Sequence, residues 1–167
     1  MTPSELLSDA FDRIQQTASA AVDGLSEEQL TERPGPEANT IAWLVWHLTR
    51  VQDDHVADVA GTEQVWTSGG YAERWGLPFD DTETGFDMDP DQVGRVRASA
   101  SALTDYLTAV TEATKRYLET LGPDDLDRVV DENWDPPVTL GARLVSVIGD
   151  DLQHAGQAAY ARGLLGA

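Results

Sequence analysis

The 167-residue sequence contains no cysteine. Disulfide bonds, thiolate metal sites and cysteine nucleophiles are therefore excluded, and histidine, aspartate and glutamate remain as the side chains that could hold a metal ion. Long apolar runs are also missing, because no window approaches the roughly 18 apolar residues that a membrane span needs. The N-terminal stretch lacks the basic start and apolar segment of a signal peptide. We therefore expect a soluble, cytoplasmic protein without membrane partners.

Basic residues are scarce. Eleven lysines and arginines stand against 30 acids, giving a formal net charge of -19, and Lys115 is the single lysine. Nucleic acids and anionic lipids are bound mainly through Lys and Arg, so neither is expected as a partner. On so acidic a chain, adjacent acids such as Asp53 and Asp54 are expected on a solvated surface, and we give them no functional weight.

Common catalytic signatures are absent as well. The sequence has no G-x-S-x-G elbow, no glycine-rich phosphate loop and no H-E-x-x-H motif. Serine-hydrolase and nucleotide-binding functions are therefore set aside. The length fits one domain, and we expect residues 1–167 to form it.

Apolar residues recur at steps of three and four along four segments, which predicts an all-α fold. The first helix is expected from Ser4, as N-cap, to about Leu25, and the second from Thr40. The third is expected to start after the cap Asp89 and to continue to Leu121 as one long helix, and the fourth to run over 140–164. We find no strand-like alternation of useful length. The prediction is a four-helix bundle.

The segment from Gly61 to Met88 connects the second and third helices and has no helical period. It is rich in Gly, Asp and Thr and carries five aromatic residues: Trp66, Tyr71, Trp75, Phe79 and Phe86. A long loop with so many aromatic residues is expected to pack against the bundle, and ordered long loops often carry function.

The sequence has three histidines, each within a predicted helix and near an acid. Asp150 and His154 are four residues apart, so they share a helix face and can chelate one metal ion. A third ligand would come from His47 or His55 on the second helix. The apolar period slightly favours His55, whereas His47 lies where an unpaired imidazole would be costly. Asp151 competes with Asp150, and each histidine could instead be structural, paired with a carboxylate.

Two stretches, NTIAWLVWHLTRVQDDHVADVAG and GDDLQHAGQAAYARGLL, together resemble the DinB/YfiT-like superfamily. More narrowly, the chain is similar to the actinobacterial DUF664 or mycothiol-transferase-like branch and to the metal-binding domain of mycothiol-dependent maleylpyruvate isomerases. The specific pattern is W-H-L followed about a hundred residues later by an acid or His four residues before a His. The resemblance covers nearly the whole chain and implies a DinB-like four-helix bundle.

The resemblance also implies a divalent-metal site, whose ligands fall on His47, Asp150 and His154. Many members of the family have His at the position of Asp150, while the isomerase branch uses a carboxylate. His55 then becomes a lining residue. Two imidazoles and one carboxylate leave coordination positions open, as in catalytic sites, with zinc as the first expectation and nickel, iron or manganese compatible with the same ligands.

The function implied by the resemblance is a metal-dependent S-transferase that joins a small-molecule thiol, mycothiol, to an electrophile. A rival hypothesis is a non-enzymatic bundle that binds a metal or small ligand, or forms a homodimer. A third, metal-assisted hydrolysis, needs a general base, and the sequence identifies none.

Overall fold

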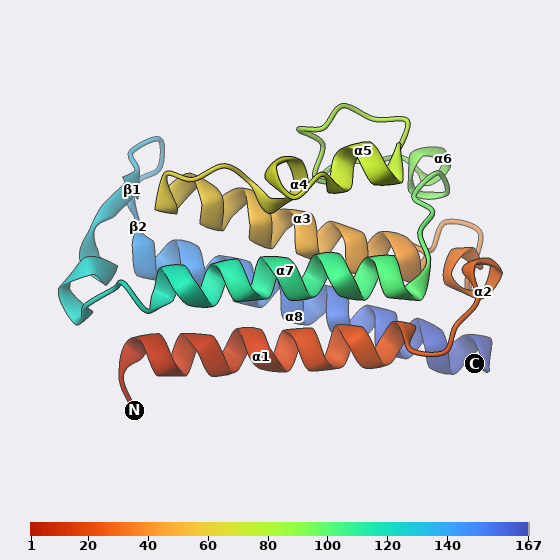
Figure 1. Ribbon diagram of the computed structural model, residues 1–167, viewed down its shortest axis with the longest axis horizontal. Helices are drawn as coiled ribbons and strands as arrows, with labels where there is room; N and C mark the ends of the chain where they lie inside the picture. Colours follow the sequence, from red (N-terminus) through yellow and green to blue (C-terminus); the bar gives the residue numbers. More distant parts are fainter. Residues whose placement is uncertain (167) are drawn as a thin grey trace.

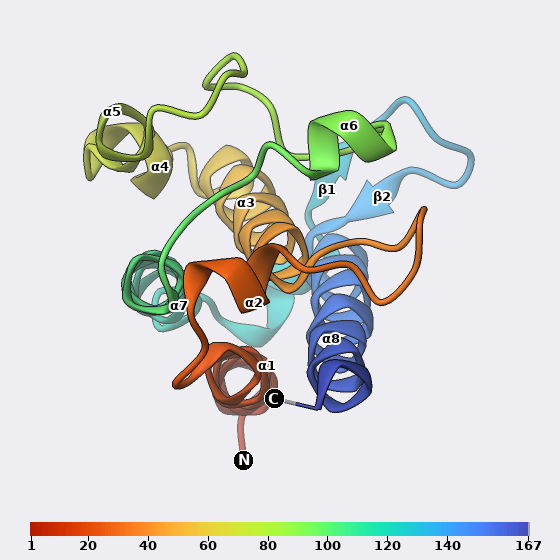
Figure 2. The same ribbon diagram turned by 90° about the vertical axis from the view of Figure 1, so that its right-hand side faces the viewer.

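Four long helices dominate the computed structural model, which describes residues 1–166. They are α1 (Pro3–Val22), α3 (Ile41–Ala60), α7 (Ala100–Leu118) and α8 (Leu140–Leu165). Helices α1 and α8 run in one direction, and α3 and α7 run in the other (Figure 1). Seen end-on, each of the four occupies one corner of a bundle (Figure 2). The predicted all-α four-helix bundle is confirmed.

Each long helix begins where a side chain caps it. The N-cap side chains of Thr2, Thr40, Ser99 and Thr139 accept hydrogen bonds from backbone N–H groups in the first turn of α1, α3, α7 and α8. Capping of this kind satisfies donors that have no partner within the helix. The N-cap of α1 is therefore Thr2, and the prediction of Ser4 was wrong by two residues.

The expected apolar stripes form the core on α1 and α3. On α3, the seven residues of the predicted stripe are buried: Ile41, Leu44, Val45, Leu48, Gln52, Val56 and Val59. On α8 the prediction was partly wrong, because Leu152 is 47 % exposed and Ala159 is also exposed, while Asp151 is buried. The buried face of α8 therefore includes Asp151 instead of Leu152.

The segment after α3 covers the outer side of that helix. It contains two short helices, α4 (Val65–Ser68) and α5 (Tyr71–Trp75), above α3 in Figure 1. The rings of Trp46 on α3, Trp66 and Trp75 pack edge to face, with centroids 6.4 and 5.4 Å apart. The prediction of a packed aromatic loop is confirmed, although Phe86 is 85 % exposed.

The third predicted helix is interrupted, which corrects the sequence interpretation. Asp89 does cap a helix, but this helix, α6 (Pro90–Val93), is short. The chain then turns through Gly94, and α7 begins only after its own cap, Ser99. The Arg33 guanidinium donates to the Pro90 carbonyl and ties this turn to the segment after α2 (Glu27–Thr31).

A small antiparallel hairpin that the sequence did not predict precedes α8. After the 3-10 helix η1 (Pro123–Asp127), strand β1 (Val129–Asp131) pairs with β2 (Val138–Thr139). Strands this short give no readable alternation. Among residues 1–166, no helix is long and apolar enough to cross a membrane.

Candidate metal centre

His47, Asp150 and His154 converge between α3 and α8. One ligand atom from each, an imidazole nitrogen or a carboxylate oxygen, lies within 4.8 Å of the others. Helices α3 and α8 lie side by side (Figure 2) and run in opposite directions (Figure 1). The structure thus groups the three residues that the family resemblance selected, and the alternatives His55 and Asp151 are outside this group.

His47 is held in one orientation by its surroundings. Its Nδ1 lies 2.6 Å from the Thr84 carbonyl oxygen, and because a carbonyl can only accept, Nδ1 carries the proton. The ring stacks on Trp43 with centroids 4.5 Å apart and planes inclined by 13°. Burial lowers the pKa of His47, which favours the neutral ring. Nε2 therefore presents a lone pair.

His154 and Asp150 complete the group from α8. The Nδ1 of His154 lies 2.9 Å from the Gln157 side-chain oxygen, and its Nε2 lies 3.6 Å from Asp150 Oδ1. The other carboxylate oxygen, Oδ2, is buried and has no hydrogen-bond partner among residues 1–166. A buried carboxylate oxygen without a hydrogen-bond partner needs another partner, such as a cation. In metal sites, the ligating imidazoles also have their second ring nitrogen bonded to an oxygen, as both Nδ1 atoms are here. This donor set fits a divalent cation.

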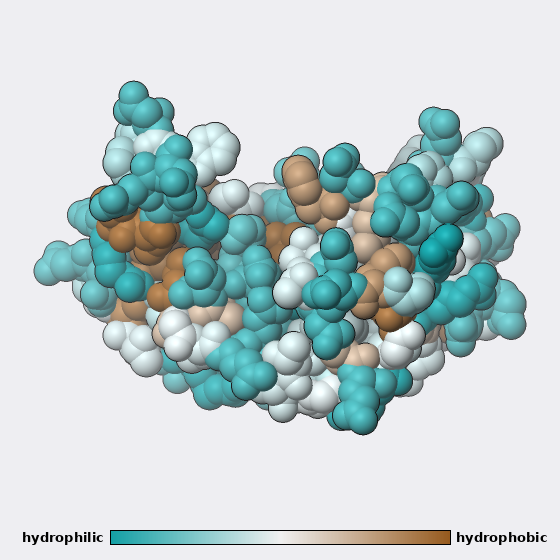
Figure 3. Space-filling model, turned by 90° about the horizontal axis from the view of Figure 1, so that it is seen from above, coloured by the Kyte–Doolittle hydropathy of each residue, from teal (hydrophilic) through white to brown (hydrophobic). Residues whose placement is uncertain are grey.

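Two of the three residues, His47 and Asp150, line a pocket of about 360 Å³. Its lining comes from α3, α8 and the loop: His47, Val51, Asp54, His55, Thr84, Phe86, Ser146, Val147 and Asp150. Seen from above, hydrophilic residues cover much of the molecule, and apolar residues form small separate areas (Figure 3). The pocket is where a small ligand could approach His47 and Asp150.

His55 lies two turns after His47 and lines the same pocket. Its Nδ1 is 2.8 Å from Nη1 of Arg143, whose Nη2 donates to Asp131 Oδ2 at 3.0 Å. Burial and the nearby guanidinium lower the pKa of His55. The expectation that His55 is a lining residue agrees with this position.

Asp151 points into the core, away from the pocket lining. It is 0 % exposed, and neither carboxylate oxygen has a hydrogen-bond partner among the described residues. Burial raises the pKa of Asp151 well above its usual range. In the sequence Asp151 is close to the apolar stripe of this helix, and the structure accordingly places it in the core.

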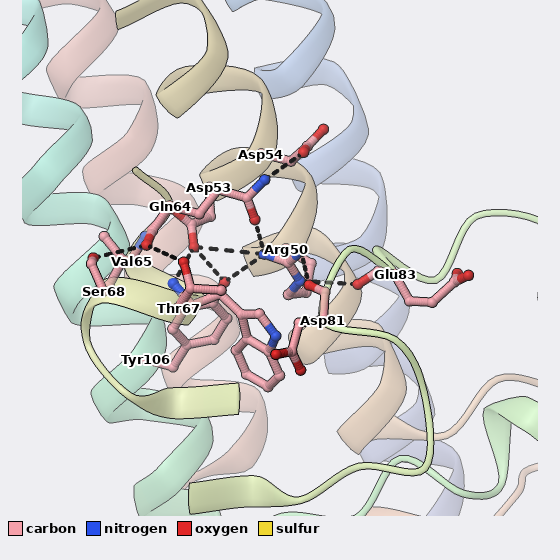
Figure 4. A network of polar contacts seen from close by, with 11 residues as sticks. Arg50, Asp53, Asp54, Gln64, Val65, Thr67, Ser68, Asp81, Glu83 and Tyr106 are labelled. Carbon is pink, nitrogen blue, oxygen red and sulfur yellow. Dashed lines mark hydrogen bonds and ion pairs between the residues drawn. The ribbon is translucent and has the colours of Figure 1, made fainter. Parts of the chain in front are cut away.

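A buried polar network one turn after His47 was missed in the sequence. Arg50 is 0 % exposed, and its guanidinium pairs with Asp53 Oδ2 at 3.7 Å (Figure 4). Asp53 also accepts hydrogen bonds from the Tyr106 hydroxyl at 2.7 Å and from the backbone of α4. Burial raises the pKa of Asp53, whereas these bonds and Arg50 act to lower it. Asp53 was dismissed as a surface acid, although Arg50, in the mostly apolar first half of the helix, was an available signal.

Arg50 fixes the loop beside the candidate metal centre. Its Nε donates to the Glu83 carbonyl at 3.1 Å and its Nη2 to the Asp81 carbonyl at 3.2 Å (Figure 4). The next carbonyl along the chain, that of Thr84, is the one that orients His47. The loop backbone is thus held on α3 at two successive turns.

The comparisons with known proteins agree with this architecture. A crystal structure of a conserved protein from Enterococcus faecalis is 31 % identical, with a TM-score of 0.92, and the match covers 99 % of this chain and 98 % of that one. No curated protein matches the sequence. The family model described as mycothiol S-transferase matches residues 6–167. The chain therefore belongs to the mycothiol S-transferase family, within the DinB/YfiT-like group.

Proposed function

We propose that this protein is a divalent-metal-dependent S-transferase that joins mycothiol to a small electrophile, with His47, Asp150 and His154 as the metal ligands. The observation that carries the proposal is the convergence of these three ligand atoms within 4.8 Å beside an open pocket. Membership of the mycothiol S-transferase family supports the thiol. The donor set supports the metal, because two nitrogens and one oxygen suit zinc, and also nickel, iron or manganese.

A bound divalent metal would lower the pKa of a thiol that reaches it, so that the thiolate forms near neutral pH. The residues of the chain prepare the site for this. Thr84 and Gln157 hold the Nδ1 protons of His47 and His154 and leave Nε2 free to bind. Trp43 contacts both rings and limits their rotation. The carboxylate of Asp150 offsets part of the positive charge.

The proposal is tested by measuring metal content and conjugation together. Wild-type protein and the His154→Ala variant are incubated with excess zinc, freed of unbound metal and examined by elemental analysis. Both are then assayed for mycothiol conjugation to a model electrophile. We expect the wild type to retain about one metal per chain and to catalyse conjugation, and His154→Ala to lose both, because a two-ligand site binds weakly.

The outcomes separate the competing functions. Wild-type protein that retains neither zinc nor, when incubated with them instead, nickel, iron or manganese contradicts the metal site. Bound metal without thiol-dependent turnover contradicts the transferase and supports the non-catalytic binding bundle. Gln15→Ala, which removes a side chain of α1 that donates to Thr108 on α7, is a suitable control because Gln15 is not in the lining of this pocket and its loss should change neither measurement.

Gly85 provides a second prediction about the same centre. Its φ is +98°, and a Cβ there would lie 2.7 Å from His47 Nδ1 and 3.0 Å from the Trp46 ring. In Gly85→Ala the loop must withdraw, and the Thr84 carbonyl moves with it. We expect metal affinity to fall by about 10- to 100-fold, the usual cost of losing a partner of a ligating histidine. Competition with a chromophoric chelator measures this affinity.

Gly24→Ala is the matched control. Gly24 also has a positive φ, +73°, but a Cβ there meets nothing within 4 Å. It should lose stability through backbone strain and keep its metal affinity. Equal affinities in Gly85→Ala and wild type would show that the loop does not orient His47.

A further inference from the structure

The three histidines of the protein present different groups to their surroundings. His47 and His154 have Nδ1 tied to oxygen atoms, so that Nε2 carries a lone pair. His55 is tied to a guanidinium instead. An arginine has only N–H donors and keeps its proton in proteins, so Nδ1 of His55 must be the acceptor. The proton of the neutral His55 ring is therefore on Nε2.

A chain of contacts from the hairpin fixes this tautomer. Asp131, the last residue of β1, accepts from Arg143 through Oδ2 at 3.0 Å and from both nitrogens of Asn133 through Oδ1. The Arg143 side chain is mostly buried, 17 % exposed, and lies between Asp131 and His55. With both ends paired, the guanidinium has a defined orientation, and the imidazole follows it.

His55 therefore offers the pocket an unpaired N–H. Among residues 1–166 the His55 ring makes its hydrogen bond through Nδ1, to Arg143, so Nε2 has no partner there, and the ring lines the pocket together with His47 and Asp150. Asp54, Asp150 and the Thr84 carbonyl are acceptors on the same wall. The Nε2–H of His55 can donate to a ligand oxygen in this pocket, and a divalent metal held by His47, Asp150 and His154 would offset the negative charge of the two carboxylates.

We propose that the Nε2–H of His55 binds the oxygen of the electrophile and selects substrates in which that oxygen takes up negative charge as the carbon–sulfur bond forms, such as epoxides. This inference rests on the proposed transferase function. As the thiolate sulfur bonds to a ring carbon, the carbon–oxygen bond breaks and its electron pair stays on oxygen. The alkoxide accepts the hydrogen bond from His55 and then takes a proton from water. The proton lost by the thiol goes to water, so the whole process is an addition.

Two electrophiles with similar carbon skeletons test the proposal. Zinc-loaded wild type, His55→Phe and His55→Gln are assayed with mycothiol and either styrene oxide, which has the oxygen, or benzyl chloride, which lacks it. We expect His55→Phe to lower kcat/KM for styrene oxide by about 10²-fold, the usual cost of removing one such donor. Turnover of benzyl chloride and metal content should stay close to wild type. His55→Gln retains an N–H and should recover part of the loss.

A proportionate loss with both electrophiles, or no loss with either, overturns the proposal. Arg143→Leu provides a further comparison, because it frees Nδ1 without removing the imidazole. It should weaken turnover of styrene oxide less than His55→Phe does.

A second readout does not depend on turnover. Nitrogen-15 NMR of histidine-labelled protein reports which ring nitrogen carries the proton, and we expect Nε2 for His55 and Nδ1 for His47. Cyclohexene oxide, added without thiol, should shift the His55 Nε2–H signal. A proton on Nδ1 of His55, or an unshifted signal, contradicts the proposal even if conjugation is observed. If the signal shifts but the protein has no transferase activity, the oxygen-binding site at His55 is supported and only the proposed transferase function is contradicted.

Discussion

Replacing Arg50 by methionine is expected to lower the free energy of unfolding by about 3–5 kcal/mol, the cost of removing one partner of a buried ion pair. Methionine fills much of the space of the arginine stem but donates no hydrogen bond. Asp53 would lose its cation, and the carbonyls of Asp81 and Glu83 would lose their donors. Urea unfolding followed by circular dichroism measures the change.

Two further variants show which part of the network matters. Tyr106→Phe removes the hydroxyl that donates to Asp53 but leaves the contacts of Arg50 with the loop, and we expect a loss of about 1.5–3 kcal/mol. Arg50→Lys keeps the charge without the planar fork of donors and should fall between wild type and methionine. A loss below about 1 kcal/mol in Arg50→Met would show that the ion pair has little net effect on stability.

The Arg50 variants also connect stability to the metal centre. If Arg50 holds the loop that presents the Thr84 carbonyl, Arg50→Lys should bind metal about 10-fold more weakly while remaining folded. Tyr106→Phe, which does not alter the loop contacts, should bind metal as wild type does. Unchanged affinity in Arg50→Lys would mean that Thr84 is held in place by other contacts.

Replacing Asp151 by alanine is expected to stabilise the protein by about 1–3 kcal/mol, the usual cost of burying a polar group without a hydrogen bond. Both carboxyl oxygens of Asp151 are buried and unpaired among the described residues. Alanine removes these oxygens and also has the highest helix propensity. The gain is offset in part by the small void that alanine leaves. Thermal and urea unfolding at neutral pH measure the difference.

Asp151→Asn is the matched control, because it has the size of aspartate and remains polar. It should gain much less than alanine, since the amide is also buried without a partner. A loss of stability in Asp151→Ala would mean that the carboxyl has a partner in solution, such as an ordered water molecule, that stabilises the fold.

The four long helices could be predicted from the sequence because their causes are local. Apolar residues at steps of three and four, with Thr or Ser before the first turn, act within one helix and its neighbouring residues. Thr40 and the buried stripe of α3 were identified in this way. Local patterns did not predict the break in the third expected helix. The turn at Gly94 and the cap at Ser99 divide it into two helices, α6 and α7.

The candidate metal centre could be predicted from the sequence only in part. The spacing of Asp150 and His154 places both on one face of α8, but spacing within α3 favoured His55 over His47. That choice depends on the rotation of α3 against α8, which no periodicity within a single helix specifies. Family resemblance selected His47, and the tertiary structure places its ring 4.8 Å from that of His154.

Contacts between segments far apart in sequence were decided by tertiary structure alone. The sequence by itself determined an acidic all-α chain without cysteine, with three histidines and an aromatic loop. Folding brought Arg50 to the carbonyls of Asp81 and Glu83, and Arg143 to His55. These contacts join residues 31 to 88 positions apart, and the contact of Arg143 sets the tautomer of His55. The proton on a ring nitrogen depends on what that nitrogen faces, and this is known only once the helices are packed.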